Sequence, residues 1–146
     1  MKIFLDIDGV MVHANPALKV EADTDGFYKF STPAIDALLL LLKKVSEPEI
    51  ILTTSHRFRY NIDEWKEIFK TRGIIINNLS RIERETPFSE SRKETLLTHF
   101  NNFNISAEDI LIIDDDRSLN GLPITLKERL ILTNTLTGLT MKDVIL

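Results

Sequence analysis

The chain has 146 residues, of which 43% are hydrophobic and 27% are charged, and it contains five glycines and five prolines. This composition excludes a disordered, collagen-like or low-complexity protein, and a chain of this length can bury a sizeable core as a single domain over residues 1–146. Cysteine is absent and the net charge is −4, which excludes a disulfide framework, a thiolate metal site and a strongly basic nucleic-acid-binding molecule.

The first part of the chain alternates predicted strands with a predicted helix. The nearly continuous apolar run Ile3–Ile7 is typical of a strand that is buried on both faces. Thr32 followed by Pro33 favours a helix start, and the helix is predicted to continue to about Val45. The β-branched run Ile50–Leu52 predicts the second strand.

The middle of the chain continues this alternation. A helix is predicted from the capping residue Asn61 to the stop signal at Gly73, because apolar residues recur on one face between them. The run Ile74–Ile76 predicts the third strand. Ser91 and Glu94 have the spacing of a capping box, which predicts the start of the next helix.

The last part predicts two more strands and a short helix. Ile110–Ile113 is another buried run, Leu130–Leu132 is a weaker one, and Thr140 with Asp143 indicates a terminal helix. Strands that alternate with helices predict an α/β fold with a doubly wound, Rossmann-like parallel sheet, because parallel neighbours need crossover connections. Ligands of such sheets bind beyond the carboxyl ends of the strands.

No membrane attachment is expected. The longest strongly apolar stretch, Ala37–Leu42, is far shorter than a bilayer-spanning helix. Acidic residues close to the N-terminus do not fit a signal peptide, so we expect a cytoplasmic protein.

Acidic, hydroxyl and basic side chains cluster where predicted strands end or helices begin. Carboxylates at the end of a buried strand are costly to desolvate, and a divalent cation is the natural compensator. The residues at these positions are Asp6 and Asp8 after the first strand, Thr53, Thr54 and Ser55 after the second, Arg92 and Lys93 at a helix start, and Asp114, Asp115 and Asp116 after the fourth.

These positions resemble, in the same order, the four motifs of the haloacid dehalogenase (HAD) superfamily. The resemblance covers nearly the whole chain. The segments IFLDIDGV, IILTTSHR and ILIIDDDRSLNGLP are similar, more narrowly, to the HAD-like domains associated with Swiss Army Knife RNA repair proteins. This resemblance implies a Mg²⁺-dependent phosphohydrolase that acts on phosphomonoesters, the substrate being a small ester, a nucleotide or a nucleic-acid end.

The resemblance also implies roles for the residues of the first motif. Asp6 would be the nucleophile and would form an aspartyl-phosphate. Asp8 would protonate the leaving oxygen and then take a proton from the hydrolytic water. Gly9 would let the backbone turn sharply away beside the bound phosphate.

Thr53, with Thr54 as the alternative, would bind the phosphoryl oxygens. Lys93, with Arg92 as the alternative, would neutralise the developing charge near the helix N-terminus. The helix register decides between the two cations, and the sequence leaves it open.

The implied metal site consists of oxygen ligands. Asp6, the backbone carbonyl of Asp8, Asp114 and Asp115 would hold Mg²⁺, and the sequence leaves open which of the last two contacts the ion. Asp116 is expected to support the site or to cap a helix.

The loop after the second strand offers further candidates for substrate binding. Ser55 and Arg57 are predicted to contact the phosphate or the substrate, and His56, Arg57 and Arg59 could together bind a second phosphate. A solvated basic loop is the alternative interpretation.

Other classes fit the sequence less well. An EF-hand is excluded because its remaining ligands are missing. Response-regulator receiver domains place their phosphoacceptor before the Thr and Lys, whereas here Thr53 and Lys93 precede the second acidic cluster. The acid at Asp8 favours a phosphatase or mutase over the HAD ATPases, which carry Thr there. A HAD-derived binding module that keeps the metal site without useful catalysis is the competing hypothesis.

The spacing of the motifs leaves little room for a cap. About two dozen residues separate Asp8 from Thr32, and with the Asp25-Gly26 turn they suffice for a small flap hairpin over about residues 10–30. Only a short loop precedes Ser91. We therefore expect a capless enzyme with an open site, which suits a large substrate.

Overall fold

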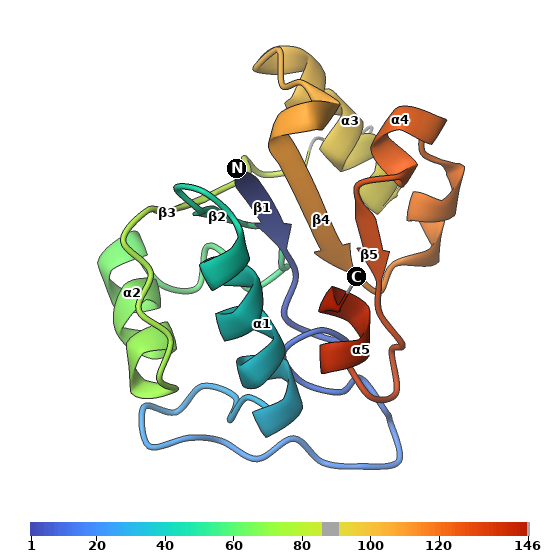
Figure 1. Ribbon diagram of the computed structural model, residues 1–146. Helices are drawn as coiled ribbons and strands as arrows, with labels where there is room; N and C mark the ends of the chain where they lie inside the picture. Colours follow the sequence, from blue (N-terminus) through green and yellow to red (C-terminus); the bar gives the residue numbers. More distant parts are fainter. Residues whose placement is uncertain (86–90, 146) are drawn as a thin grey trace.

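The computed structural model, which describes residues 1–85 and 91–145, is built on a sheet of five parallel strands (Figure 1). The strand order is β3-β2-β1-β4-β5, so β1 lies at the centre and the chain winds first to one side of it and then to the other. This is the doubly wound sheet that the sequence predicts. The strands are β1 (Lys2–Leu5), β2 (Glu49–Leu52), β3 (Leu79–Arg81), β4 (Ile110–Asp114) and β5 (Leu130–Leu132).

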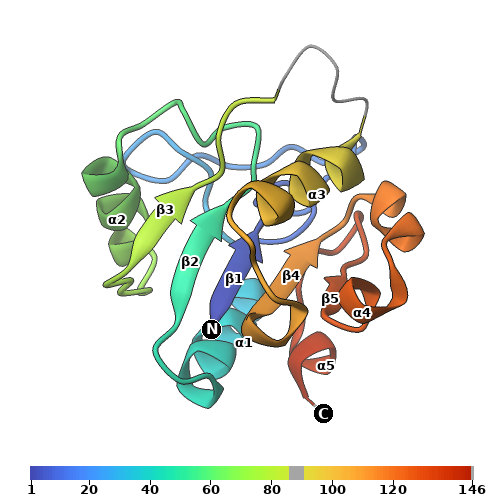
Figure 2. The same ribbon diagram turned by 90° about the horizontal axis from the view of Figure 1, so that it is seen from above.

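Helices cover both faces of the sheet (Figures 1 and 2). One face packs against α1, α2 and α5, and the other packs against α3, α4 and the 3₁₀ turn η2. Within the described residues, no helix combines the length and the apolar character needed to cross a bilayer. The elements are α1 (Thr32–Lys44), α2 (Ile62–Thr71), α3 (Arg92–Asn102), η1 (Ala107–Asp109), η2 (Arg117–Gly121), α4 (Ile124–Lys127) and α5 (Met141–Val144).

The predicted helix starts are close to the observed ones. Ser31 caps α1, one residue before the predicted cap. Asn61 and Glu64 form the capping box of α2, with both hydrogen bonds present. The Ser91 side chain accepts a hydrogen bond from the backbone N–H of Glu94, which fixes the start of α3.

Two apolar clusters hold the layers together. Ile3 and Leu5 of β1 face the first cluster, whereas Phe4 between them faces the second. Burial on both sides of the sheet explains why β1 is a continuous apolar run and not an alternating one.

The predicted position of the third strand is wrong. Ile74 and Ile76 are buried, but they belong to the connection between α2 and β3, and Ile75 between them is 71% exposed. The strand itself is Leu79–Arg81, at the edge of the sheet. Its residues Ser80 and Arg81 are polar because an edge strand is held by backbone pairing with β2 and needs little apolar surface.

The segment between β1 and α1 runs along the edge where the strands end (Figure 1). It contains the predicted flap, a narrow turn in which Ala22 pairs antiparallel with Tyr28 around Gly26. The guanidinium of Arg72, the C-cap of α2, donates two hydrogen bonds to the Asp25 carboxylate, at 2.6 and 2.9 Å, and a third to the Tyr28 carbonyl. The flap is thereby fastened to α2, and the described chain holds no larger cap over this edge.

Candidate active site

The three central strands end at the same level. Leu5 at the end of β1 pairs with Leu52 of β2 and with Ile113 of β4. The ladder continues one step further, because the Asp6 N–H donates to the Ile113 carbonyl at 3.1 Å and the Thr53 N–H donates to the Leu5 carbonyl at 2.9 Å. Asp6, Thr53 and the end of β4 therefore lie side by side.

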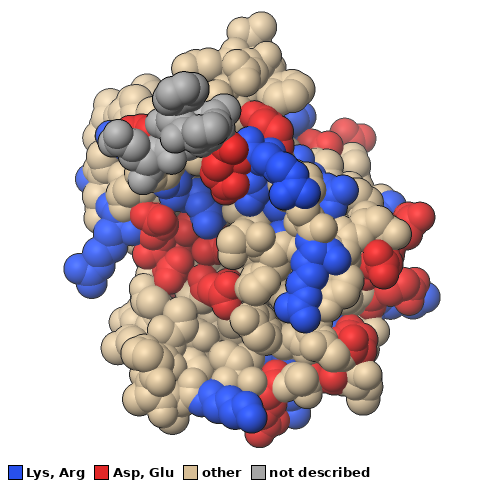
Figure 3. Space-filling view, turned by 180° about the vertical axis from the view of Figure 1, so that it is seen from behind, with Lys and Arg blue, Asp and Glu red and all other residues tan. Residues whose placement is uncertain are grey.

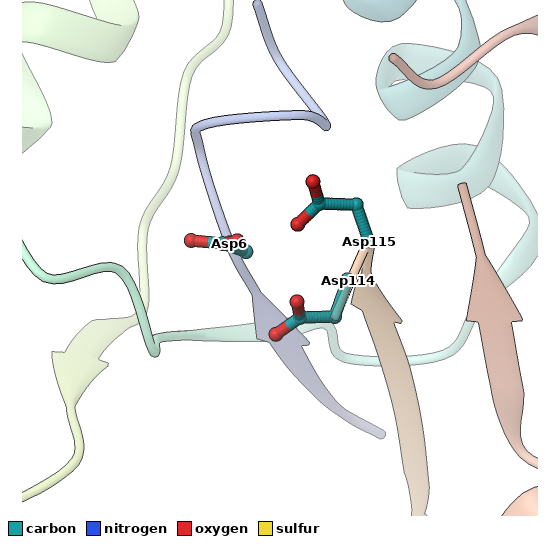
Figure 4. A group of neighbouring side chains, drawn as sticks. All are labelled: Asp6, Asp114 and Asp115. Carbon is teal, nitrogen blue, oxygen red and sulfur yellow. The ribbon is translucent and has the colours of Figure 1, made fainter. Parts of the chain in front are cut away.

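Three carboxylates gather at this edge (Figure 4). Asp6, Asp114 and Asp115 each offer an oxygen, and these oxygens lie within 4.8 Å of one another. Asp6 is 5% exposed and Asp114 is fully buried. Burial, and then the charge of Asp114, raise the pKa of Asp6 well above its usual value, and burial also raises the pKa of Asp114. Buried, mutually repelling carboxylates of this kind fit the binding of a divalent cation.

Arg92, at the first position of α3, is the cation that reaches this cluster. Its Nη1 lies 2.8 Å from Asp114 Oδ2, 3.0 Å from Thr53 Oγ1 and 3.8 Å from Asp6 Oδ1. Burial alone would lower the pKa of Arg92, but the charges of Asp114 and Asp6 outweigh it and raise the pKa. The guanidinium thus stays charged and offsets part of the negative charge of the cluster.

Lys93 points elsewhere. Its backbone N–H donates to Ser118 Oγ, and its side chain lies beside Gly121, where a Cβ would come within 3.3 Å of Lys93 Nζ. Of the two cations that the sequence leaves open, Arg92 is the one with contacts to the cluster, and the predicted role of Lys93 stays a prediction.

The Asp8 side chain stands apart from the three clustered carboxylates. Its Oδ2 lies 2.9 Å from Nε2 of His56, in the loop after β2. The side chain of Asp8 is 42% exposed and that of His56 is 22% exposed, so the pair faces the open side of the edge. The sequence places both residues at strand ends but contains no signal that pairs them.

Gly9 makes the turn after Asp8 possible. Its φ of +79° lies in the left-handed region, and a Cβ there would overlap the Asp115 carboxylate. The Thr133 hydroxyl donates a 2.7 Å hydrogen bond to the Gly9 carbonyl and holds the turn against the end of β5. A side chain at Gly9 would displace the third carboxylate of the cluster.

The hydroxyl side chains after β2 have different surroundings. Thr53 and Thr54 are both buried, but only Thr53 bonds to Arg92 at the cluster. Thr54 Oγ1 accepts the His56 N–H at 3.2 Å and so supports the following turn. Ser55 is exposed. Thr53 therefore has the position expected for a phosphate-binding hydroxyl.

Arg57 does not lie in a position to bind substrate, and its assignment as a phosphate ligand is corrected. Its side chain is 1% exposed. The guanidinium donates to the carbonyls of Ile82, Thr54 and Glu83 at 3.0, 3.0 and 2.7 Å and forms a 3.0 Å ion pair with Glu85. These contacts tie the loop after β2 to the segment after β3.

Asp116 caps a helix, which is one of the two roles predicted for it. Its carboxylate accepts the Ser118 N–H at 2.9 Å at the start of η2, and its own N–H donates to Asp114 Oδ1 at 3.0 Å. Of the three consecutive acids, Asp114 and Asp115 therefore remain for a cation.

Known proteins resemble this chain to different degrees. No curated protein matches the sequence. Among solved structures, the chain is similar to the cobalt-bound deoxy-D-mannose-octulosonate 8-phosphate phosphatase of Haemophilus influenzae, at 13% identity and a TM-score of 0.44 over 97% of this chain and 82% of that one. Residues 2–144 match the family described as the HAD domain in Swiss Army Knife RNA repair proteins. The chain therefore belongs to this family of HAD domains.

Proposed function

We propose that the chain is a phosphatase that hydrolyses phosphomonoesters through a phosphorylated Asp6. The observation that carries this proposal is the convergence of Asp6, Asp114 and Arg92 at the carboxyl edge of the sheet. A carboxylate can attack a negatively charged phosphoryl group only where fixed positive charge offsets the repulsion. Arg92 supplies one such charge beside Asp6.

We propose Mg²⁺ as the cofactor. Asp6, Asp114 and Asp115, with the backbone carbonyl of Asp8, would hold it, since these donors are all oxygens and Mg²⁺ prefers oxygen ligands. When bound, the ion neutralises charge on the carboxylates and on the phosphoryl group. The absence of a side chain at Gly9 leaves room for the Asp115 carboxylate.

The protein's own residues carry out the proton transfers and the phosphoryl transfers. The Asp6 carboxylate attacks phosphorus, the bond to the leaving oxygen breaks, and Asp8 gives that oxygen its proton. The Asp8 carboxylate then takes a proton from water, whose oxygen attacks the same phosphorus. The bond between phosphorus and Asp6 breaks, inorganic phosphate leaves and Asp6 is restored. Thr53 and Arg92 bind the phosphoryl oxygens during both steps.

We propose a phosphorylated nucleic-acid end as the substrate, with nucleotides as smaller members of the same class. The family is named for RNA repair proteins, and the described chain carries only the small flap beside the site, which leaves room for a polymer. On the face shown in Figure 3, basic and acidic side chains lie close together and form no broad basic surface. The chain as a whole has a net charge of −4, so contact with the reacting end would contribute more to binding than general attraction to a polyanion.

The test is phosphate release with Mg²⁺ from 3′- and 5′-phosphorylated oligonucleotides, nucleotides, sugar phosphates and phosphopeptides. We expect the oligonucleotide ends to be preferred and Asp6→Asn to lower turnover by about three orders of magnitude or more. Equal turnover by Asp6→Asn would contradict the mechanism. Strong preference for a sugar phosphate would contradict the substrate class, and no release from any ester would favour a binding module.

A further inference from the structure

We propose that His56 is a positioning residue that holds the Asp8 carboxyl in the orientation for proton transfer to the leaving oxygen. The inference rests on the proposed phosphatase function. Nε2 of His56 donates a hydrogen bond to Oδ2 of Asp8, at 2.9 Å, and the remaining oxygen of the carboxyl serves the leaving group. His56 itself touches no reacting atom.

The His56 ring is held in place from several sides. Its backbone N–H is bonded to Thr54 Oγ1 at 3.2 Å. The rings of Phe27 and Tyr28 stand nearly perpendicular to it, at interplanar angles of 80° and 90° and centroid distances of 5.6 and 5.4 Å. Edge-to-face packing of this kind restricts rotation of the imidazole. A fixed donor can orient a carboxyl that would otherwise sample several rotamers in solvent.

The flap takes part in this support. Phe27 and Tyr28 belong to the flap, and Phe27 is 1% exposed. Arg72, the C-cap of α2, holds the turn through Asp25 and the Tyr28 carbonyl. The orientation of Asp8 therefore depends, through His56, on a flap that is anchored to the body of the protein.

A purely stabilising role explains the pair less well. Both side chains are partly exposed, and ion pairs or hydrogen bonds in solvent add little to folding stability. A role in orientation needs no such contribution, because a small error in the angle of the acid has a large effect on the rate of proton transfer.

The leaving group distinguishes the two roles. A simple alcohol, such as the ribose hydroxyl of a 3′-phosphorylated oligonucleotide, must be protonated as it leaves. p-Nitrophenolate leaves without a proton. Loss of a well-oriented acid should therefore lower kcat/KM for the alkyl ester and spare kcat/KM for p-nitrophenyl phosphate, because kcat/KM covers only the steps up to departure of the leaving group. The later attack of water, which also uses Asp8, is common to both esters and does not enter kcat/KM.

The experiment compares kcat and KM for these two substrates in wild type, His56→Phe and His56→Gln. We expect His56→Phe to lower kcat/KM for the alkyl ester about tenfold or more and kcat/KM for p-nitrophenyl phosphate less than about twofold. His56→Gln should restore part of the lost rate, because its amide N–H can still donate to Asp8.

Two further variants serve as controls. His99→Phe is the matched one, since Nδ1 of His99 lies 2.8 Å from Oε2 of Glu83 and its ring packs against Phe4 on the other face of the sheet. It should leave both substrates unaffected. Adding His56→Phe to Asp8→Asn should cause no further loss, because His56 acts only through Asp8.

Each other result counts against the proposal. Equal losses of kcat/KM on both substrates would make His56 a structural residue. A rise in KM with kcat unchanged would make it a substrate ligand, and unchanged kcat and KM would remove its role. If His56→Phe does not fold, the ratio of kcat/KM for the two substrates in His56→Gln decides. If wild type hydrolyses neither ester, or if Asp6→Asn is fully active, the proposed phosphatase function fails as well. If wild type is active, Asp6→Asn is inactive and the His56 variants keep the wild-type rates, only the positioning role is overturned.

Discussion

Arg92 and Lys93 are neighbours in the sequence, yet they face different parts of the molecule. Successive helical residues point about 100° apart, so only one of two adjacent side chains can face the end of β1. The cap at Ser91 sets this register and turns Arg92 toward Asp6 and Asp114.

We therefore predict that Arg92→Ala lowers kcat by about a hundredfold or more, because it removes the positive charge beside the nucleophile. Arg92→Lys should recover part of the lost kcat, since an ammonium keeps the charge but not the planar set of donors. Lys93→Ala is the matched control and should stay within about twofold of wild type. Steady-state kinetics of the three variants would check this, and a larger loss in Lys93→Ala would reverse the assignment.

The loop after β2 depends on Arg57 for its attachment to the segment after β3. Arg57→Ala would leave the carbonyls of Ile82 and Glu83 without this donor, whereas the Thr54 carbonyl would keep the backbone N–H of residue 57. We predict a loss of about 3 kcal/mol or more in the free energy of unfolding, with KM for substrate unchanged once the protein is folded. Urea denaturation and steady-state kinetics measure the two quantities. A raised KM with unchanged stability would restore Arg57 as a phosphate ligand.

The attachment of the flap to α2 predicts a dependence of stability on pH. The hydrogen bonds from Arg72 lower the pKa of Asp25 in the folded protein. The folded state thus binds the proton of Asp25 less tightly than the unfolded state. The stabilisation is complete above the unfolded pKa and is lost as the pH falls through the folded pKa.

Asp25→Asn should therefore reduce the difference in melting temperature between neutral and acid pH. Thermal denaturation over a pH series measures it, with Asp36→Asn, at an exposed position of α1, as the control. An unchanged pH profile in Asp25→Asn would show that Arg72 does not hold the flap in solution.

Helices and strands can be predicted from the sequence where their own apolar side chains form the core or their own polar side chains cap them. The strands β1, β2 and β4 are apolar runs because both faces are covered, and α1 to α3 carry local capping signals. β3 fails this rule. Its apolar neighbours Ile74 and Ile76 are buried by the connection, whereas Leu79–Arg81 is defined by backbone pairing with β2, which leaves little trace in the sequence.

For the whole molecule, the repulsion between the carboxylates clustered at the carboxyl edge of the sheet predicts that a divalent cation stabilises the fold. At a free Mg²⁺ concentration of about 100 times the dissociation constant, binding to the folded state alone would add about 2.7 kcal/mol. Asp115→Asn should reduce the rise in melting temperature that Mg²⁺ causes relative to a chelator. Asp116→Asn, which removes a charge but keeps the oxygen that caps η2, should keep that rise. Equal rises in wild type and Asp115→Asn would argue against the site.

The part of the candidate site that lies directly at strand ends could be predicted from the sequence. Asp6, Thr53 and Asp114 follow buried strands that pair in parallel, so their meeting follows from topology. The contact of Asp8 with His56 could not be predicted, because it joins two loops whose conformations depend on the packing of the flap and on Thr54. Local sequence contains no information on such a pairing.

The central position of β1 has a consequence for the order of folding. Asp6 meets Asp114 only when β1, near the start of the chain, pairs with β4. The first three strands and the helices α1 and α2 can assemble before that pairing, without bringing these carboxylates together. Electrostatic repulsion between the carboxylates therefore opposes the pairing of β1 with β4 and not that of β1 with β2, and we expect a divalent ion to favour the first of these pairings.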